Sequence, residues 1–139
     1  MESTDALPVV PVVAAEILDE QGRYLIAQRN AHAVMPLLWE FPGGRVRQGE
    51  REQDALVRCL KATLGITVEC VDRKMTVSKP YQAYQVQLAV WSCHIVQGEP
   101  QCLYVHDFRW VRTEELSTYS FPPADQQSVD ELLGFTAQS

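Results

Sequence analysis

A glycine, a glutamate and an arginine stand at intervals that could shape a metal-binding turn ahead of a helix. They are Gly44, Glu50 and Arg58. The three helix positions at which side chains could bind the metal are occupied by Cys59, Ala62 and Thr63. Positions 59, 62 and 63 have i, i+3 and i+4 spacing, so on a helix they share one face. Carboxylates there would converge on Mg²⁺, which prefers oxygen ligands, and the metal would activate water for attack on a diphosphate.

The residues at these three positions cannot replace carboxylates. Cysteine offers a soft ligand, threonine one neutral oxygen and alanine no ligand atom, so none carries the charge that Mg²⁺ needs. We therefore predict no metal site on this face and no cofactor, with Mg²⁺ or Mn²⁺ required only if the chain is an active hydrolase after all. We expect a neutral, exposed helix surface. A nucleophilic Cys59 beside Arg58 and Lys61 is an alternative, although its mid-helix position argues for an inert thiol.

The pattern around these residues is similar to a known family motif. Gly44, Glu50, Arg58, Leu60, Gly65 and Ile66 fall in register with the Nudix box, in which positions 59, 62 and 63 are glutamates. The segments LWEFPGG at 38–44 and FPPAD at 121–125 also resemble MutT-like members of the Nudix hydrolase superfamily. The resemblance spans about residues 8 to 133, with a degenerate Nudix box that lacks its metal-binding glutamates. It implies that Glu50 and Arg58 form a structural pair that ties the loop to the helix.

The elements that must position these residues alternate between strands and helices, which favours an α/β sandwich. We predict strands at 8–18, 24–28, 67–70, 74–78, 84–96 and 108–111, with the first two forming a hairpin. Helices are predicted at 50–64, at 113–116 through a threonine cap, and at 125–133. The resemblance sharpens this to the Nudix fold, an α/β/α sandwich with a mixed curved sheet and a loop–helix–loop box. Residues 1–139 are predicted to form a single domain, with residues 1–7 flexible.

The resemblance also implies where a ligand would bind. In MutT-like proteins the base lies against the early strands and the start of the last helix, which here correspond to Arg29 and Asp125. Asp125 could instead cap the last helix, and Arg29 could be a solvated charge. Tyr81 and Tyr84 could stack on a base or simply pack against the sheet.

Composition limits the remaining function classes. The net charge of −6 weighs against a general nucleic-acid surface, and no apolar run suits a membrane helix. The four cysteines form no Cys-x-x-Cys pair, so we expect free thiols in a reducing cytoplasm and no zinc site.

Three functions remain open at this point. The first is a Nudix-fold protein, impaired or inactive as a metal-dependent hydrolase, that binds a nucleotide, another small phosphate ligand or a protein partner. The second is an active Nudix hydrolase of a nucleoside di- or triphosphate, with a displaced metal site built from Glu40, Glu50, Glu99 and Asp107. The third is a stand-alone nucleic-acid recognition domain, similar to the C-terminal domain of adenine DNA glycosylases.

Overall fold

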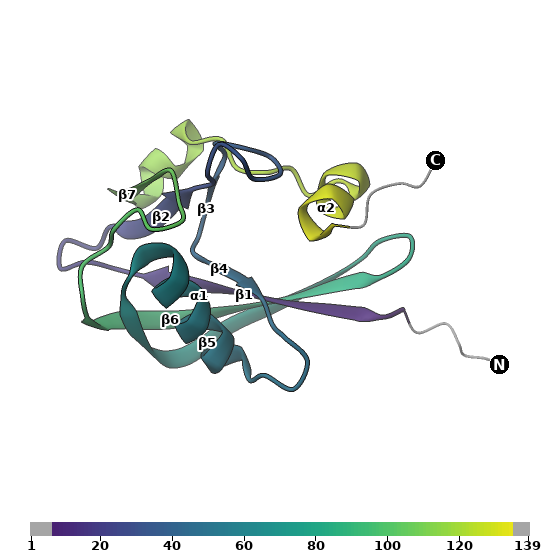
Figure 1. The fold of residues 1–139 in the computed structure, drawn as a ribbon, viewed down its shortest axis with the longest axis horizontal. Coiled ribbons are helices and arrows are strands. Elements are labelled where there is room, and N and C mark those ends of the chain that lie inside the picture. Colours follow the sequence, from purple (N-terminus) through teal and green to yellow (C-terminus); the bar gives the residue numbers. More distant parts are fainter. Residues whose placement is uncertain (1–6, 135–139) are drawn as a thin grey trace.

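The computed structural model describes residues 7–134, and Figure 1 shows how their helices and strands are arranged. Of residues 1–7, which are predicted to be flexible, residues 1–6 lie outside this part of the chain. The described elements are β1 (Val9–Ile17), β2 (Tyr24–Gln28), β3 (Trp39–Glu40), β4 (Gly43–Arg45), α1 (Glu52–Leu64), β5 (Thr67–Pro80), β6 (Gln85–Gln97), β7 (Asp107–Val111), the 3-10 helix η2 (Thr113–Thr118) and α2 (Gln126–Leu133).

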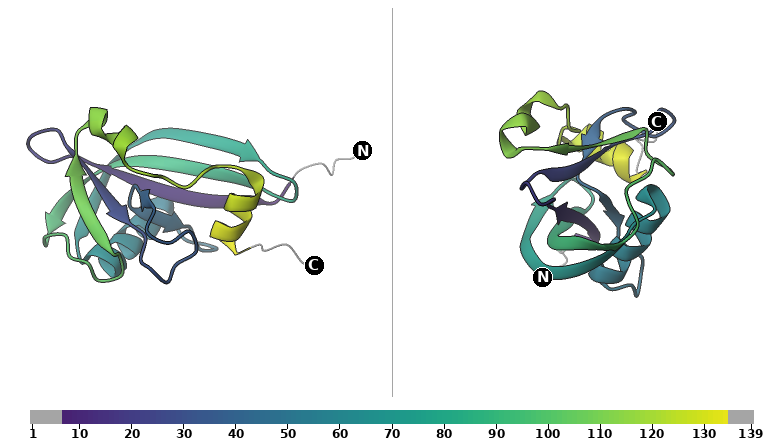
Figure 2. Two further views of the ribbon diagram at one scale, coloured as in Figure 1. Left: turned by 90° about the horizontal axis from the view of Figure 1, so that it is seen from above. Right: turned by 90° about the vertical axis from the view of Figure 1, so that its left-hand side faces the viewer.

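The larger sheet has the strand order β4-β1-β6-β5, and its β1–β6 pair is parallel while the other two pairs are antiparallel. Helix α1 covers one face of this sheet because Ala55, Leu56, Leu60 and Leu64 recur at helical spacing and are all buried. The smaller sheet, α2 and η2 lie on the other side, and the long β5–β6 pair curves along its length (Figure 2). The predicted α/β sandwich with a mixed curved sheet is confirmed.

The predicted hairpin between the first two strands is wrong. Strand β2 belongs to a separate sheet of order β3-β2-β7, and its only described ladder contact with the β1 side is the isolated bridge between Leu18 and Tyr24. The reason is that β4 and β6 already occupy both edges of β1. The chain therefore turns at Asp19, whose carboxylate accepts from the backbone N–H groups of Gln21 and Arg23, and β2 pairs with β7.

The two strands predicted at 67–70 and 74–78 are one continuous strand, β5. Its register against β6 shifts between Cys70 and Asp72 and again between Arg73 and Met75. These β-bulges disturb the alternation of side chains between the two faces. The sequence pattern consequently suggested a break where the structure has none.

The helix boundaries differ from the prediction by small amounts with clear causes. Helix α1 begins at Glu52 with Arg51 as its N-cap, because Glu50 is held in the preceding loop. The predicted threonine cap of the short helix is wrong, since Arg112 occupies that position in η2. Asp125 caps α2 by accepting from the Ser128 N–H at 2.8 Å.

Candidate functional site

The loop before α1 is held by an ion pair between Glu50 and Arg58. The Arg58 Nε donates to Glu50 Oε2 at 2.8 Å, one Arg58 terminal nitrogen donates to Oε1 at 2.9 Å, and the Arg47 backbone N–H donates to the same Oε1 at 2.9 Å. Hydrogen bonds from Arg58 and Arg47 lower the pKa of Glu50 to about 2. Arg58 also donates to the Arg45 carbonyl at 3.0 Å, so the pair fixes the loop to the helix.

The helix face formed by positions 59, 62 and 63 is only partly exposed. Cys59 is 8% exposed and lies against Gly44 of β4, where an added Cβ would approach its sulfur to 2.8 Å. Ala62 is exposed, and the Thr63 hydroxyl is committed to the Cys59 carbonyl at 2.8 Å. The expectation of an exposed surface is therefore wrong at Cys59, because strand β4 covers it.

The burial of Cys59 also bears on its chemistry. Burial raises the pKa of the Cys59 thiol, and the neighbouring Arg58 lowers it by less. A thiol that is protonated and covered is a poor nucleophile. This counts against the alternative in which Cys59 attacks a substrate.

The displaced carboxylates do not assemble a metal site. No group of three or more His, Cys, Asp or Glu residues within residues 7–134 could hold a metal ion. Both oxygens of Glu50 accept from Arg58, Glu40 is paired with Arg29, and Glu99 lines a separate hollow beside the turn at Asp19. Tyr104, which lies before β7 and carries no carboxylate, is 70% exposed. The described residues therefore do not fit a metal held by protein carboxylates on the α1 face.

A cavity of about 390 Å³ lies beside the box loop, between the two sheets and α2. Its walls are mainly apolar and include Val12, Ala14, Leu88, Phe121, Val129 and Leu132. Arg29 and Glu40 also line it, and an Arg29 terminal nitrogen donates to Glu40 Oε1 at 3.1 Å. Arg29 is further fixed by its Nε, which donates to the Val34 carbonyl at 2.7 Å.

The Arg29–Glu40 pair gives this cavity one donor group and one acceptor group. Burial raises the pKa of Glu40, while Arg29 opposes the shift through its charge and hydrogen bond. Glu40 is the only carboxylate among the described residues that line the cavity. An apolar cavity with a few convergent polar groups is the usual form of a small-molecule site.

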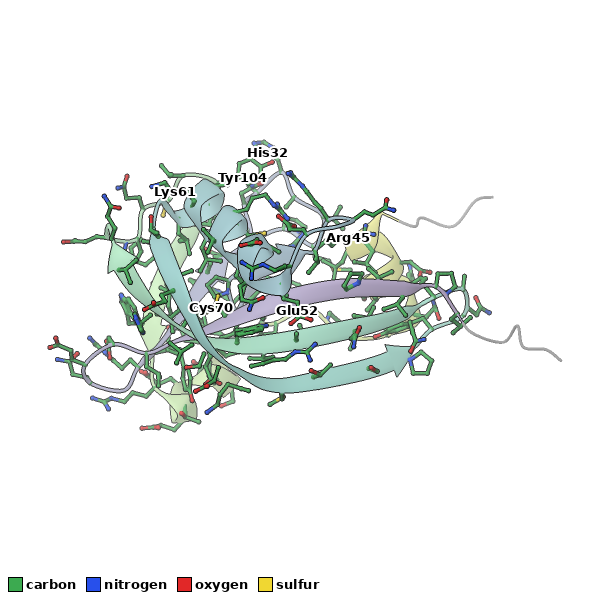
Figure 3. The ribbon with its side chains drawn as sticks, turned by 90° about the horizontal axis from the view of Figure 1, so that it is seen from below. His32, Arg45, Glu52, Lys61, Cys70 and Tyr104 are labelled. Atoms are coloured by element: carbon green, nitrogen blue, oxygen red, sulfur yellow. The ribbon has the colours of Figure 1, made fainter. Side chains whose placement is uncertain are left out.

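The floor of the cavity continues into the box loop through Gly43, Gly44 and Arg45. An added Cβ at Gly43 would come within 1.9 Å of the Val13 carbonyl oxygen, so only glycine allows this close approach of β4 to β1. Figure 3 shows Arg45 extending towards α2, where it donates to the Leu133 carbonyl at 3.0 Å. The cavity and the face that carries Cys59 thus meet at Gly44.

The structure places the other predicted ligand residues around the cavity and not on its lining. Asp125 caps α2, which confirms the capping alternative; ligand binding by Asp125 stays a prediction. The rings of Tyr81 and Tyr84 stack on each other at 5.5 Å between centroids. Their hydroxyl groups donate to the Ala124 carbonyl and to Asp130, so both join the β5–β6 hairpin to the α2 region.

Sequence reasoning missed the apolar wall of the cavity. Its members come from the larger sheet, from the loops that contain Phe41 and Phe121, and from α2, and they are ordinary apolar residues without a local motif. The available signals were the FPPAD segment, which contains Phe121, and the apolar spacing of the last helix. Only the packing of α2 against the sheet brings these residues together.

Comparison with known proteins agrees with this fold and site. Residues 13–131 match the model of the NUDIX domain. The match covers most of the chain, which therefore belongs to the NUDIX family.

Relatives of known function come from this family. The chain is 30% identical over 131 residues to the CTP pyrophosphohydrolase of Escherichia coli K12, covering 94% of this chain and 96% of that protein. It is 28% identical over 116 residues to the 8-oxo-dGTP diphosphatase of the same organism, covering 84% and 90%.

Two solved structures show the same fold. The solution structure of the Escherichia coli ORF135 protein matches with a TM-score of 0.71 and 30% identity, over 92% of this chain and 91% of that one. The MutT protein from Methanosarcina mazei Go1 matches with a TM-score of 0.71 and 23% identity, over 96% of both chains. The described residues contain no helix that is long and apolar enough to cross a membrane.

Family membership corrects the expectation that no metal is used. The Nudix hydrolases to which the chain is related depend on divalent metal ions, so the prediction of no cofactor is wrong. The prediction rested on the three box positions alone. It overlooked the fact that Mg²⁺ is often bound largely by substrate phosphates, with only one or two carboxylates from the protein.

Proposed function

We propose that the protein is a Nudix hydrolase of a nucleoside triphosphate, binding the base in the cavity and the phosphates along the box loop. The observation that carries this proposal is the cavity itself, with its Arg29–Glu40 pair and its floor of Gly43 and Gly44. A base is flat and apolar on its faces and polar at its edge. It therefore suits apolar walls with one donor and one acceptor.

Arg29 and Glu40 would orient the base. The guanidinium donates and the carboxylate accepts, and nucleobases offer adjacent acceptors and donors on their pairing edges. Because Val34 holds Arg29 in place, the pair is preorganised. The pair would set the orientation of the bound base more than it would discriminate between different bases.

The divalent metal ion would arrive as part of the substrate, bound to the triphosphate. Phosphate oxygens are strong ligands for Mg²⁺, so its delivery requires no carboxylate on α1. The uncharged positions 59, 62 and 63 would leave the ion less well held than three glutamates would. We therefore expect activity at a lower rate than an intact box would give.

The test is a hydrolysis assay with a nucleotide panel that includes CTP, 8-oxo-dGTP, ATP and UTP. Each would be assayed with Mg²⁺, with Mn²⁺ and with a chelator, and released pyrophosphate and phosphate would be measured. We expect metal-dependent turnover of at least one nucleotide, lost in the chelator. No turnover with any nucleotide under either metal would reject hydrolysis.

The base site is tested separately by Arg29→Met, with Arg23→Met as the matched control. Arg23 pairs with Asp19 in the β1–β2 turn and does not line the cavity. Removing a hydrogen-bonding cation from a buried base should weaken binding of a non-hydrolysable triphosphate by about 1.5–3 kcal/mol, and Arg23→Met should change nothing. Equal affinities for the two variants would place the base elsewhere.

A second candidate is nucleotide binding without appreciable turnover. The observation that favours it is the face of Cys59, Ala62 and Thr63, which carries no carboxylate. In that case the analogue would bind, Arg29→Met would weaken it, and the hydrolysis assay would show no product. The two experiments together distinguish this outcome from a hydrolase and from a protein that binds no nucleotide.

A further inference from the structure

Two cysteines face each other across the β5–β6 ladder, outside the nucleotide cavity. Cys70 and Cys93 are direct partners in the antiparallel register, and their sulfur atoms are 3.4 Å apart. Cys93 is 5% exposed and Cys70 is half-buried. Both pack beneath α1, and Figure 3 shows Cys70 on the sheet beside this helix.

The backbone already has a separation that a disulfide needs. Directly opposite residues of an antiparallel pair have Cα atoms about 4.5–5.5 Å apart, within the range of about 4.4–6.8 Å found in disulfides. The sulfur atoms need to approach from 3.4 Å to about 2.05 Å. Rotation of the two side chains can supply this change, and the bulge after Cys70 gives the local backbone room to adjust.

We propose that Cys70 and Cys93 are a redox modification site, which a peroxide oxidises to a reversible disulfide. In the first step the Cys70 sulfur attacks the peroxide O–O bond, forming a sulfenic acid and releasing water from hydrogen peroxide. In the second step the Cys93 sulfur attacks the Cys70 sulfur, the S–O bond breaks, and a second water leaves. Two thiols are oxidised and one peroxide is reduced to two waters, and an external thiol reverses the reaction.

The structure assigns different roles to the two sulfurs. Cys70 is the more accessible, and it accepts a hydrogen bond from the Cys93 thiol, which favours its thiolate. Burial raises the pKa of both thiols, and the pKa of Cys93 is raised further by its burial and by the hydrogen bond that it donates to Cys70. Cys70 is therefore the thiol oxidised first, and Cys93, held 3.4 Å from it, resolves the sulfenic acid.

The disulfide would lock the centre of the β5–β6 pair under the first turn of α1. The Cys70 thiol lies 4.0 Å from the carbonyl of Gln53 in that turn, so oxidation also changes a contact with the box helix. A cross-link closes the β5–β6 hairpin in the unfolded chain and thereby lowers its entropy. We expect the oxidised protein to melt several degrees higher than the reduced protein.

The test uses Cys102→Ser, which removes the exposed thiol that could otherwise link two molecules. The reduced protein is treated with hydrogen peroxide and digested without reductant. We expect a Cys70–Cys93 linked peptide, two fewer free thiols, a higher melting temperature and full reversal by dithiothreitol. Cys70→Ser and Cys93→Ala in the same background should abolish the linked peptide and the thermal shift, and having two variants guards against one that does not fold.

Two outcomes would overturn the proposal. One is that peroxide leaves Cys70 and Cys93 as free thiols at concentrations that oxidise Cys102 in the unmodified chain. The other is that Cys70 is oxidised alone, to sulfinic or sulfonic acid, without a linked peptide. Either result would show that the two sulfurs do not react with each other despite their separation.

Discussion

The ionisation of Glu50 is strongly controlled by its surroundings. Arg58 and the Arg47 N–H hold its carboxylate, and its pKa falls to about 2 from an ordinary value of 4.5. A folded pKa below the unfolded pKa means that the unfolded state binds the proton more readily. The stabilisation from this pair is therefore present above about pH 4.5 and is lost as the pH falls from there towards 2.

We predict that Glu50→Gln destabilises the protein at neutral pH and that this loss of stability becomes smaller as the pH falls. The variant cannot form the ion pair with Arg58 at any pH, whereas the natural residue loses it only on protonation. Urea unfolding of both proteins across this range measures the difference in free energy of unfolding. A difference that stays constant between neutral pH and pH 2 would mean that the pair contributes no pH-dependent stability.

The buried position and the more exposed positions on the α1 face should respond differently to substitution by glutamate. Ala62 is exposed and Thr63 is half-buried, so Ala62→Glu with Thr63→Glu should fold and gain affinity for Mn²⁺. Cys59→Glu must place a longer, charged side chain against Gly44, which we expect to cost about 2 kcal/mol or more in stability. Calorimetry with Mn²⁺ and thermal melting separate the effects.

The matched comparison is between the double variant and the single Cys59→Glu variant. If Cys59→Glu melts like the unmodified protein, the β4 strand yields easily and Cys59 is not a packing residue. If the double variant binds no Mn²⁺, two carboxylates on this face are too few to hold a divalent ion.

Residue spacing predicted which side chains share a helix face but not what covers them. Cys59, Ala62 and Thr63 do lie along one side of α1, as their spacing requires. The burial of Cys59 depends on β4, which reaches the helix only because Gly44 carries no side chain. That close approach is a long-range contact that helical periodicity does not contain.

At the level of elements, the sequence predicted which segments form strands and helices better than it predicted which strands pair. Strand β2 and the buried face of α1 match the prediction because they follow from local alternation and helical periodicity. The β1–β2 hairpin failed because pairing depends on which strand edges remain open, and β4 and β6 occupy both edges of β1. The Arg29–Glu40 pair joins the end of β2 to β3, so its existence depends on the pairing of these two strands.

The start of α2 gives a prediction about Asp125. Its carboxylate accepts from the Ser128 N–H and hydroxyl, and these bonds lower its pKa. Asp125→Ala should therefore lower the melting temperature, while Asp125→Asn keeps an acceptor and should lower it much less. Thermal melting and triphosphate binding of both variants are the measurements.

The binding arm of this comparison tests the role of Asp125 as a ligand residue. Asparagine retains the cap but adds an N–H₂ donor where the carboxylate could only accept. Normal affinity in Asp125→Asn, with a stability loss only in Asp125→Ala, identifies a cap. Weakened affinity in a stable Asp125→Asn would instead show that a ligand contacts this side chain.

At the scale of the whole molecule, the cavity exists because three separate parts of the chain close around it. The larger sheet supplies one wall, the polar pair of Arg29 and Glu40 lies at a second side, and α2 supplies a third through Val129, Leu132 and Leu133. Helix α2 is attached to the β5–β6 hairpin by polar contacts, including one from the Gln82 N–H to the Gln126 side chain at 2.8 Å. The position of α2, and hence the shape of the cavity, depends on these contacts.

We therefore predict that Tyr84→Phe weakens nucleotide binding without touching the cavity. Tyr84 is 5% exposed, and its hydroxyl donates to Asp130, which also accepts from the Gln126 side chain at 2.8 Å. Removing a hydrogen bond to a charged group should cost about 1.5–3 kcal/mol. The loss should appear as faster amide exchange in α2 and a higher dissociation constant for the triphosphate analogue, because the third wall is less firmly held.

Tyr104→Phe is the matched control, since Tyr104 is 70% exposed and away from α2. Faster exchange in α2 with unchanged affinity would show that the ligand does not use this wall, and unchanged exchange would show that the apolar contacts of α2 suffice to hold it.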